Sequence, residues 1–224
     1  MASYKKSENT RELIISTASK LFYEKGYQAA TVRDVAREAK LSLSRLNYHF
    51  NSKVELAAQI VSTFLINLGD EIRRLDFMED DRMWCNVVHI RLFMKFLLTE
   101  NKSTDFLYEM ALADNLRKMI LESVYRHFRR QAKILGLHRD QQTLRMYAHI
   151  CVGAMVNLFC AKREQDLAAD EKIILDMFNE LHLKLLDLSE EKRENYIESA
   201  EIYTSRVTFE VCDLIHPRVI YKPE

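Results

Sequence analysis

Residues 31–56 read TVRDVAREAKLSLSRLNYHFNSKVEL, and this stretch decides the fold of the N-terminal part of the chain. Thr31 is a good N-cap, and Asp34 follows three residues later, where its carboxylate meets the free N–H groups and the positive end of the helix dipole. Ser42 can cap a second short helix, because apolar residues follow it at helical spacing. Two short helices joined by about three residues are the pattern of a helix-turn-helix.

A longer helix is expected on either side of this pair. Before it, TRELIISTASKLFYEKGYQ repeats apolar residues at helical spacing, and Gly26 supplies the C-terminal stop. After it, Ser52 and Glu55 form an S-x-x-E capping box that starts a long helix through Leu68. The two longer helices are predicted to buttress the helix-turn-helix.

The second short helix carries many hydrogen-bonding side chains outside its buried positions, Leu46 and Phe50. Ser, Arg and Asn side chains can reach base edges in a major groove, and Tyr, His and Lys side chains can reach phosphates. A solvated surface helix, which is the alternative interpretation, would be richer in Glu and Lys. The candidate DNA-facing residues are Leu43, Ser44, Arg45, Asn47, Tyr48, His49 and the flanking Lys53.

Charge is unevenly distributed along a chain whose formal net charge is zero. Residues 1–60 contain ten Lys and Arg residues against six Asp and Glu residues, so the rest of the chain is mildly acidic. A basic module attached to an acidic body is typical of a protein that meets a polyanion at one end only.

The composition predicts an all-α protein. Only four Gly and two Pro residues occur among the 224, and both prolines lie near the C-terminus. A sheet protein of this size would need turn residues about every 8–12 positions. No apolar run approaches the roughly 20 residues of a membrane span, and the first ten residues contain no hydrophobic leader. We therefore expect a soluble cytoplasmic protein without a membrane partner.

No constellation of residues indicates catalysis. The cysteines Cys85, Cys151, Cys160 and Cys212 lack the spacing of a zinc site and are interpreted as buried apolar residues. The seven histidines are scattered singly, without a metal motif or a catalytic carboxylate partner. We expect no enzyme activity, no cofactor and no metal.

Residues 31–56, with LFYEKGYQAAT before them, resemble the DNA-binding signature of the TetR family of transcriptional regulators. The resemblance covers about the first 60 residues. The positions that agree in residue type and spacing are Phe22, Gly26, Tyr27, Thr31, Val35, Ala36, Ala39, Ser42, Leu46, His49, Phe50, Lys53 and Leu56.

The resemblance adds two residues to the predicted DNA-facing set, Thr31 and Arg33 at the start of the first short helix. It also implies that Leu43 approaches bases, where its side chain could pack on a thymine methyl group. Two positions depart from the family pattern. Lys40 stands where the family usually has a glycine suited to positive φ, and Asn47 stands where a tyrosine is common.

Helical patterns continue to the end of the chain, over residues 80–100, 103–113, 114–135, 140–163 and 167–188. The tail from Ser189 is expected to form one more helix, with a disordered end after Pro217. The expected organisation is a helix-turn-helix domain over 1–52, a connecting helix over 53–75 and a helical sensing and dimerisation domain over 76–224.

Many aromatic and methionine residues lie in the middle helices. Each is either ordinary core or the lining of a cavity for an apolar or amphipathic ligand. The resemblance implies such a cavity but assigns no residue to it. The residues in question are Trp84, Phe93, Met94, Phe96, Phe106, Met110, Met119, Tyr125, Phe128, Met146 and Tyr147.

The helices over 140–163 and 167–188 have the pattern of a dimer interface. Small residues at Ala148, Gly153 and Ala154 would allow close helix approach, although the same residues would suit an intramolecular core. The resemblance implies a four-helix bundle across a two-fold axis. The apolar stripe of the second helix is Ile174, Met177, Phe178, Leu181 and Leu185.

Together these observations predict a homodimeric DNA-binding transcriptional regulator, a repressor that a small apolar or amphipathic ligand releases from a palindromic operator. The alternative is a regulator of the same fold that acts as a co-activator or as a structural or interaction factor without a small-molecule inducer.

Overall fold

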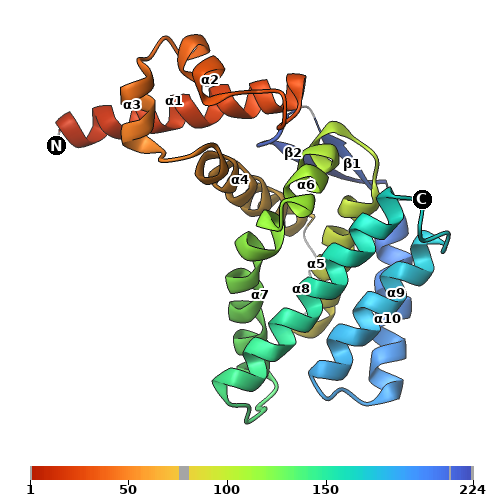
Figure 1. Cartoon of the computed structure of the whole chain (residues 1–224). Helices are drawn as coiled ribbons and strands as arrows, with labels where there is room; N and C mark the ends of the chain where they lie inside the picture. Colours follow the sequence, from red (N-terminus) through yellow and green to blue (C-terminus); the bar gives the residue numbers. More distant parts are fainter. Residues whose placement is uncertain (1, 76–80, 212, 223–224) are drawn as a thin grey trace.

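The computed structural model describes residues 2–75, 81–211 and 213–222. Over these ranges the chain forms ten helices and one antiparallel pair of strands, so the predicted all-α class is confirmed apart from the strand pair (Figure 1). The elements are α1 (Ala2–Lys25), α2 (Val32–Glu38), α3 (Leu43–His49), α4 (Lys53–Arg74), α5 (Arg82–Leu98), α6 (Lys102–Leu112), α7 (Asn115–Ile134), α8 (Gln141–Arg163), α9 (Glu171–Leu185), α10 (Glu190–Ser205), β1 (Val207–Val211) and β2 (Pro217–Tyr221).

Helices α1 to α3 form a cluster at one end of the molecule (Figure 1). Thr31 and Asp34 make the predicted capping box at the start of α2, and Ser42 caps α3 by accepting a hydrogen bond from the Arg45 amide. Gly26, directly after α1, has a φ of 83°, a backbone conformation that glycine adopts without strain. The local signals for the three helices are therefore confirmed.

Helix α4 runs from this cluster into the helical body (Figure 1). Ser52 caps it as expected, accepting a hydrogen bond from the Glu55 amide at 3.1 Å. The Glu55 carboxylate does not complete the predicted capping box. It accepts instead from the Asn51 amide at 2.8 Å and the Asn51 side chain at 3.0 Å, one residue earlier.

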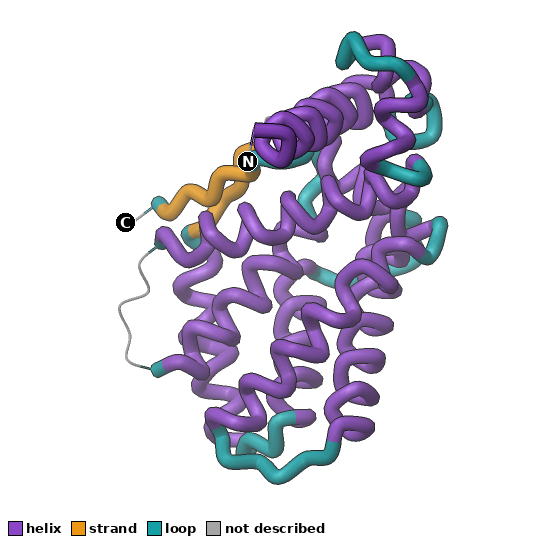
Figure 2. The backbone as a smooth tube through the Cα atoms, turned by 90° about the vertical axis from the view of Figure 1, so that its left-hand side faces the viewer, coloured by secondary structure: helices purple, strands orange, loops and turns teal. Residues whose placement is uncertain are grey.

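The body consists of α5 to α10, and its long helices lie roughly side by side (Figures 1 and 2). Helix α5 contacts α4, α6, α8, α9 and α10 and is the central element. Arg91 of α5 is fully buried, donating to the Thr204 hydroxyl of α10 at 3.1 Å and to the Asp176 carboxylate of α9 at 2.6 Å. This paired guanidinium ties three helices together.

The described residues after α10 form two paired strands, so the prediction of disorder directly after Pro217 is wrong for residues 217–221. Strands β1 and β2 pair in antiparallel register, and the Asp213 carboxylate accepts from two turn amides, those of Ile215 and His216. An aspartate closes this turn, which is why counting Gly and Pro residues missed the hairpin. The hairpin is anchored to the body, because Lys95 Nζ donates to the carbonyls of Thr204 and Val207.

Most of the aromatic and methionine side chains are core, including Trp84, Phe96 and Phe128. Cys151 is also buried as predicted, whereas Cys85 and Cys160 are half-buried. Cys212 lies outside the described residues, as does residue 76, where the third domain was expected to begin.

Helix α8 is long and apolar enough to cross a membrane by length and composition alone, which the sequence expectation had not recognised. It packs against α6, α7 and α9, and a third of its most apolar window is buried. Met146 and Ile150 are exposed apolar side chains of α8. Ile173 and Met177 are exposed apolar side chains of α9.

The apolar stripe predicted for α9 is divided between two faces. Met177 is 66% exposed, but Ile174 and Phe178 are buried inside the protomer. The assignment of Phe178 to a dimer interface is therefore wrong. A stripe of this width covers two helical faces, and sequence periodicity alone did not separate them.

Candidate nucleic-acid interface and internal cavity

Helix α3 turns Leu46 and Phe50 into the core of the N-terminal cluster, as predicted. Its remaining side chains face outward, and Tyr48 is 82% exposed. The structure exposes seven of the nine predicted DNA-facing residues and leaves the other two half-buried. The exposed ones are Thr31, Arg33, Leu43, Ser44, Arg45, Asn47 and Tyr48, and the half-buried ones are His49 and Lys53.

Arg45 is tied to α1 by a hydrogen bond of its side chain. Its Nη2 donates to the Thr10 hydroxyl at 3.2 Å, a bond that joins α3 to the first helix. Next to it, the Ser42 and Ser44 hydroxyls lie 3.1 Å apart. A guanidinium fixed at one nitrogen still has further N–H groups for a bidentate contact with guanine.

His49 lies between two guanidinium groups. Burial, followed by the charges of Arg45 and Arg11, lowers its pKa below 6.5. The imidazole is therefore neutral at pH 7, and it meets Tyr48 edge-on, with ring centroids 5.1 Å apart. A phosphate brought close to this ring would favour its protonated form.

Arg11 is a cation of this surface that sequence reasoning did not single out. It lies 5.1 Å from the Phe50 ring centroid and donates to Gln59 Oε1 at 2.6 Å. Its place beside α3 depends on how α1 crosses α3, which no short-range pattern encodes. The only available signal was its positive charge in the basic N-terminal segment.

Thr31 and Lys53 have structural partners within the N-terminal cluster. The Thr31 hydroxyl donates to Asp34 at 2.6 Å while accepting from the Asp34 amide. Lys53 Nζ lies 4.2 Å from the Tyr27 ring centroid and 3.4 Å from the Gln28 carbonyl. Burial lowers the pKa of Lys53. A contact of Thr31 or Lys53 with DNA would come in addition to these contacts within the N-terminal cluster.

The turn between α2 and α3 adopts the backbone that the glycine of the family pattern would suit. Lys40 has a φ of 55°, and the Leu41 amide donates to the Ala36 carbonyl at 2.9 Å. The expectation of a left-handed residue at Lys40 is confirmed. A left-handed backbone at a non-glycine residue costs roughly 1–2 kcal/mol.

The surface from Thr31 to Lys53 is basic. It contains five Lys and Arg residues and two acidic residues. One of the acids, Asp34, is paired with Arg37 at 2.5 Å and accepts hydrogen bonds from the amide and the hydroxyl of Thr31. Its pKa is lowered, chiefly by the hydrogen bond from Thr31. This surface therefore presents net positive charge to an approaching polyanion.

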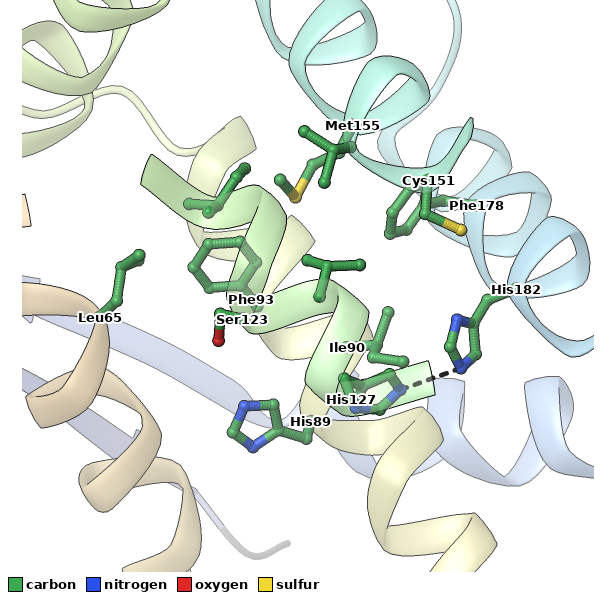
Figure 3. Close-up of a pocket in the computed structure, with 13 residues that line it drawn as sticks. Leu65, His89, Ile90, Phe93, Ser123, His127, Cys151, Met155, Phe178 and His182 are labelled. Atoms are coloured by element: carbon green, nitrogen blue, oxygen red, sulfur yellow. Dashed lines mark hydrogen bonds between the residues drawn. The ribbon is translucent and has the colours of Figure 1, made fainter. Parts of the chain in front are cut away.

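A cavity of about 190 Å³ lies in the helical body, between α4, α5, α7, α8 and α9 (Figure 3). Most of the residues around it are apolar. Of the aromatic and methionine residues that the sequence offered as candidates, Phe93 lines it. The other lining residues are Leu65, His89, Ile90, Ile120, Ser123, Val124, His127, Cys151, Val152, Met155, Phe178 and His182.

Three histidines form the polar side of this cavity (Figure 3). His127 Nε2 and His182 Nε2 lie 3.3 Å apart, so one donates a hydrogen bond to the other. Burial lowers the pKa of His182 to about 3 and that of His89 to about 4, the latter with help from Arg73 and Arg130. All three rings are neutral at pH 7, since burial also lowers the pKa of His127 well below 6.5. This cluster was not predictable from local sequence patterns, because its members come from three separate helices.

Two sets of contacts connect the helical body to the N-terminal cluster. Phe106 of α6 stacks on Phe22 of α1 with ring centroids 5.9 Å apart. Glu109 of α6 accepts from the Gln28 amide at 2.9 Å. Helix α4 belongs to both parts, since it begins beside α3 and contributes Leu65 to the cavity. A change of cavity shape can therefore reach α3 through packed helices.

An exposed basic helix-turn-helix on a helical body with an internal cavity is the architecture of a DNA-binding regulator with a sensing domain. Comparison with known proteins agrees. Residues 14–60 match the family described as bacterial regulatory proteins, tetR family. The likeness to this family lies in that segment, which holds the helix-turn-helix.

Curated relatives match over the same region. HTH-type transcriptional regulator HbdR of Aromatoleum sp. (strain CIB) is 37% identical over 67 residues, which is 30% of this chain and 29% of the relative. HTH-type transcriptional repressor KstR2 of Rhodococcus jostii (strain RHA1) is 35% identical over 65 residues, which is 29% of this chain and 32% of the relative. The chain thus spans about a third of the length of the curated relatives it matches.

The fold likeness extends over most of the chain. The crystal structure of RolR in complex with resorcinol superposes with a TM-score of 0.61, covering 88% of this chain and 95% of RolR at 16% sequence identity. RolR without ligand gives a TM-score of 0.60 at 14% identity, covering 84% of this chain and 96% of RolR. At these identities the comparison shows a common fold for the N-terminal cluster and the helical body, and no more.

Proposed function

We propose that this protein is a sequence-specific DNA-binding transcriptional regulator, a repressor that a small ligand in the internal cavity releases from its operator. The single observation that carries the proposal is the exposed polar face of α3, set in a basic surface and held rigidly by buried Leu46 and Phe50. A rigid helix with exposed Arg, Asn and Ser side chains suits base reading in a major groove.

Each predicted contact has a role in this proposal. Arg45 reads guanine, Asn47 and Ser44 contact base edges, and Leu43 packs on a thymine methyl group. Arg33, Tyr48, His49, Lys53 and Thr31 contact phosphates, which position α3 without reading sequence. Arg11 joins the phosphate-binding set, because its charge acts directly on His49.

The cavity supports the ligand part of the proposal. Its lining is mostly apolar, and its walls belong to five helices, including α4, which leads to the DNA-binding cluster. A ligand that changes the packing of these walls would shift α4 and the contacts of α6 with Phe22 and Gln28. Such a shift alters the position of α3 and so lowers DNA affinity.

A homodimer completes the proposal. Met146, Ile150, Ile173 and Met177 are exposed apolar residues on α8 and α9, and a Cβ at Gly153 would meet nothing within 4 Å. Burying these residues against a second copy gives two α3 helices related by a two-fold axis, which would read a palindromic operator. It also gives the apolar face of α8 a partner other than a membrane, in keeping with a cytoplasmic regulator.

The second candidate is a regulator of the same fold that controls transcription through protein contacts, without an inducer. No feature of the cavity favours it. No enzymatic reaction is proposed, because within the described ranges no hydrogen bond joins the cavity histidines to a carboxylate or to Ser123 and Cys151, the hydroxyl and thiol that line the same cavity.

Selection from a pool of random duplex DNA tests the proposed function. The purified full chain is expected to enrich a palindromic sequence with half-sites about one helical turn apart. The matched control is a variant carrying Arg45→Ala and Asn47→Ala, which retains the buried residues of α3 and should enrich nothing. Enrichment of the same sequence by that variant, or no enrichment by the natural chain, would contradict the proposal.

A further inference from the structure

We propose that the effector is an amphipathic organic anion, whose apolar group fills the internal cavity and whose acid group binds Arg126 and Arg130 at the mouth of that cavity. This inference rests on the proposed function, because it names the class of ligand that the sensing domain takes.

A second, wider hollow adjoins the first. It has a volume of about 670 Å³ and shares His89, Ser123 and His127 with the apolar cavity. The shared residues come from α5 and α7, so the two spaces meet along these helices. A ligand can thus extend from the apolar cavity into the wider hollow. The remaining lining residues are Arg73, Arg82, Cys85, Asn86, Arg126, Arg130, Gln131 and Ile134.

The wider hollow is strongly cationic. Four arginines line it, and no acidic residue does so within the part of the chain that the structure describes. Arg73 is paired with Asp70, but Arg126 and Arg130 form no ion pair with any described residue. The charge of Arg130 reaches two of the three cavity histidines, since it contributes to the lowered pKa of His89 and of His127.

The arrangement of α7 explains why the charge gathers at this place. Ser123, Arg126, His127 and Arg130 are spaced three and four residues apart, so one face of the helix carries them along the junction of the two hollows. Guanidinium groups bind carboxylate and phosphate oxygens through paired N–H donors. An acid group at this junction would meet two such donors.

A buried side chain without a partner provides a second, independent indication of a ligand. Gln131 is 3% exposed and lines the wider hollow, yet its Oε1 accepts no hydrogen bond from any described residue. A buried acceptor left without a donor is costly. A hydroxyl or N–H group of the ligand, next to its acid group, would satisfy it.

The volume of the apolar cavity sets the size of the other end of the ligand. A protein cavity of about 150 Å³ lined by apolar side chains holds benzene. The 190 Å³ measured here therefore suits one aromatic ring or a chain of about eight carbons. Neutral His89, His127 and His182 can hydrogen-bond to polar atoms of the ligand but offer it no charge.

Calorimetric titration of the DNA-free protein tests this inference. The probes are octanoate and octyl phosphate, which distinguish a carboxylate from a phosphate headgroup, and 1-octanol, which has the same chain without charge. We expect one of the two anions to bind at least about tenfold more tightly than the alcohol, because charge-assisted hydrogen bonds to arginine are lost with the alcohol. Equal affinity for all three probes, or no binding of either anion, would overturn the inference.

Variants locate the acid group. The double variant Arg126→Gln with Arg130→Gln should reduce anion affinity at least about tenfold and leave the alcohol unaffected. Arg129→Gln is the matched control, since Arg129 is exposed on the same helix and lines neither hollow. Phe93→Trp should weaken both the anions and the alcohol by filling the apolar cavity. Unchanged anion binding in the double variant would overturn the assignment.

Separate measurements distinguish this inference from the proposed function. Titration without DNA reports on the ligand class, and binding to the selected duplex reports on DNA recognition. Anion binding that does not release DNA would refute the proposed repressor mechanism and leave the ligand class supported. Release of DNA by 1-octanol but by neither anion would support the repressor mechanism and refute the proposed ligand class.

Discussion

Replacing His182 with glutamine should flatten the dependence of stability on pH. His182 is buried in the cavity wall, where its Nε2 accepts from Asn86 Nδ2 at 3.4 Å and lies 3.3 Å from His127 Nε2. Burial lowers its pKa from 6.5 to about 3. The unfolded chain therefore takes up a proton at this residue as the pH falls below 6.5, whereas the folded chain does not until about pH 3. Stability attributable to neutral His182 is thus complete above pH 6.5 and is lost as the pH falls.

The magnitude follows from that difference. Each pKa unit corresponds to about 1.4 kcal/mol, so at pH 5 protonation of the unfolded chain at His182 alone lowers the free energy of unfolding by about 2 kcal/mol. Glutamine retains a hydrogen-bonding group for His127 and does not titrate. The variant should lose about 2 kcal/mol less than the natural chain between pH 8 and pH 5.

Urea unfolding at a series of pH values and one fixed protein concentration measures this difference. His138→Gln provides the control, since His138 is exposed in the loop before α8 and its loss should leave the profile of the natural chain. If His182→Gln has the same slope between pH 8 and pH 5 as the natural chain, His182 is not held neutral by burial and the description of the cavity wall is wrong.

Four further substitutions test the turn, the interface and the core. Lys40→Gly should leave the free energy of unfolding unchanged or raise it by up to about 1 kcal/mol, because glycine removes the strain of positive φ while adding unfolded-state entropy. A loss of more than about 1 kcal/mol in thermal melting would show an unrecognised contact of Lys40. Gly153→Glu should give folded monomers in sedimentation and circular dichroism, and a folded Gly153→Glu dimer would place the interface elsewhere. Phe178→Asp should instead unfold the protomer, since Phe178 is buried within it. Arg91→Ala should cost more than about 1 kcal/mol in urea unfolding, because it removes the packing of a fully buried side chain and its bonds to Thr204 and Asp176, although Asp176 keeps its ion pair with Lys172. A smaller cost would show that Arg91 does not tie α5 to α9 and α10.

Local signals allowed the helix-turn-helix to be predicted from sequence. Caps at Thr31, Ser42 and Ser52 mark where three helices begin, and the buried pair of α3 follows from its spacing. The left-handed backbone at Lys40 was expected only from the resemblance to the TetR family, whose pattern usually has a glycine there. These features depend on residues within about four positions of one another.

The remaining features depend on contacts between distant segments. The three cavity histidines come from α5, α7 and α9, and each alone resembles an ordinary core residue. Arg11 reaches the surface of α3 only through the crossing of two helices. The hairpin after α10 is closed by a single aspartate, so composition did not reveal it. Phe178 faced the wrong way in the prediction because an apolar stripe does not state which partner covers it.

The central claim is that the outer face of α3 reads DNA sequence. Fluorescence anisotropy on the selected duplex and on its single-base variants, with the natural chain, Arg45→Ala and Lys53→Ala, tests this claim most directly. Arg45→Ala should weaken specific binding by about 1–3 kcal/mol and remove the preference at one base pair in each half-site. Lys53→Ala should weaken all duplexes alike and reduce the salt slope by about one unit per protomer. Equal loss on every duplex with Arg45→Ala would contradict the claim, because Arg45 would then contact only the backbone of the DNA.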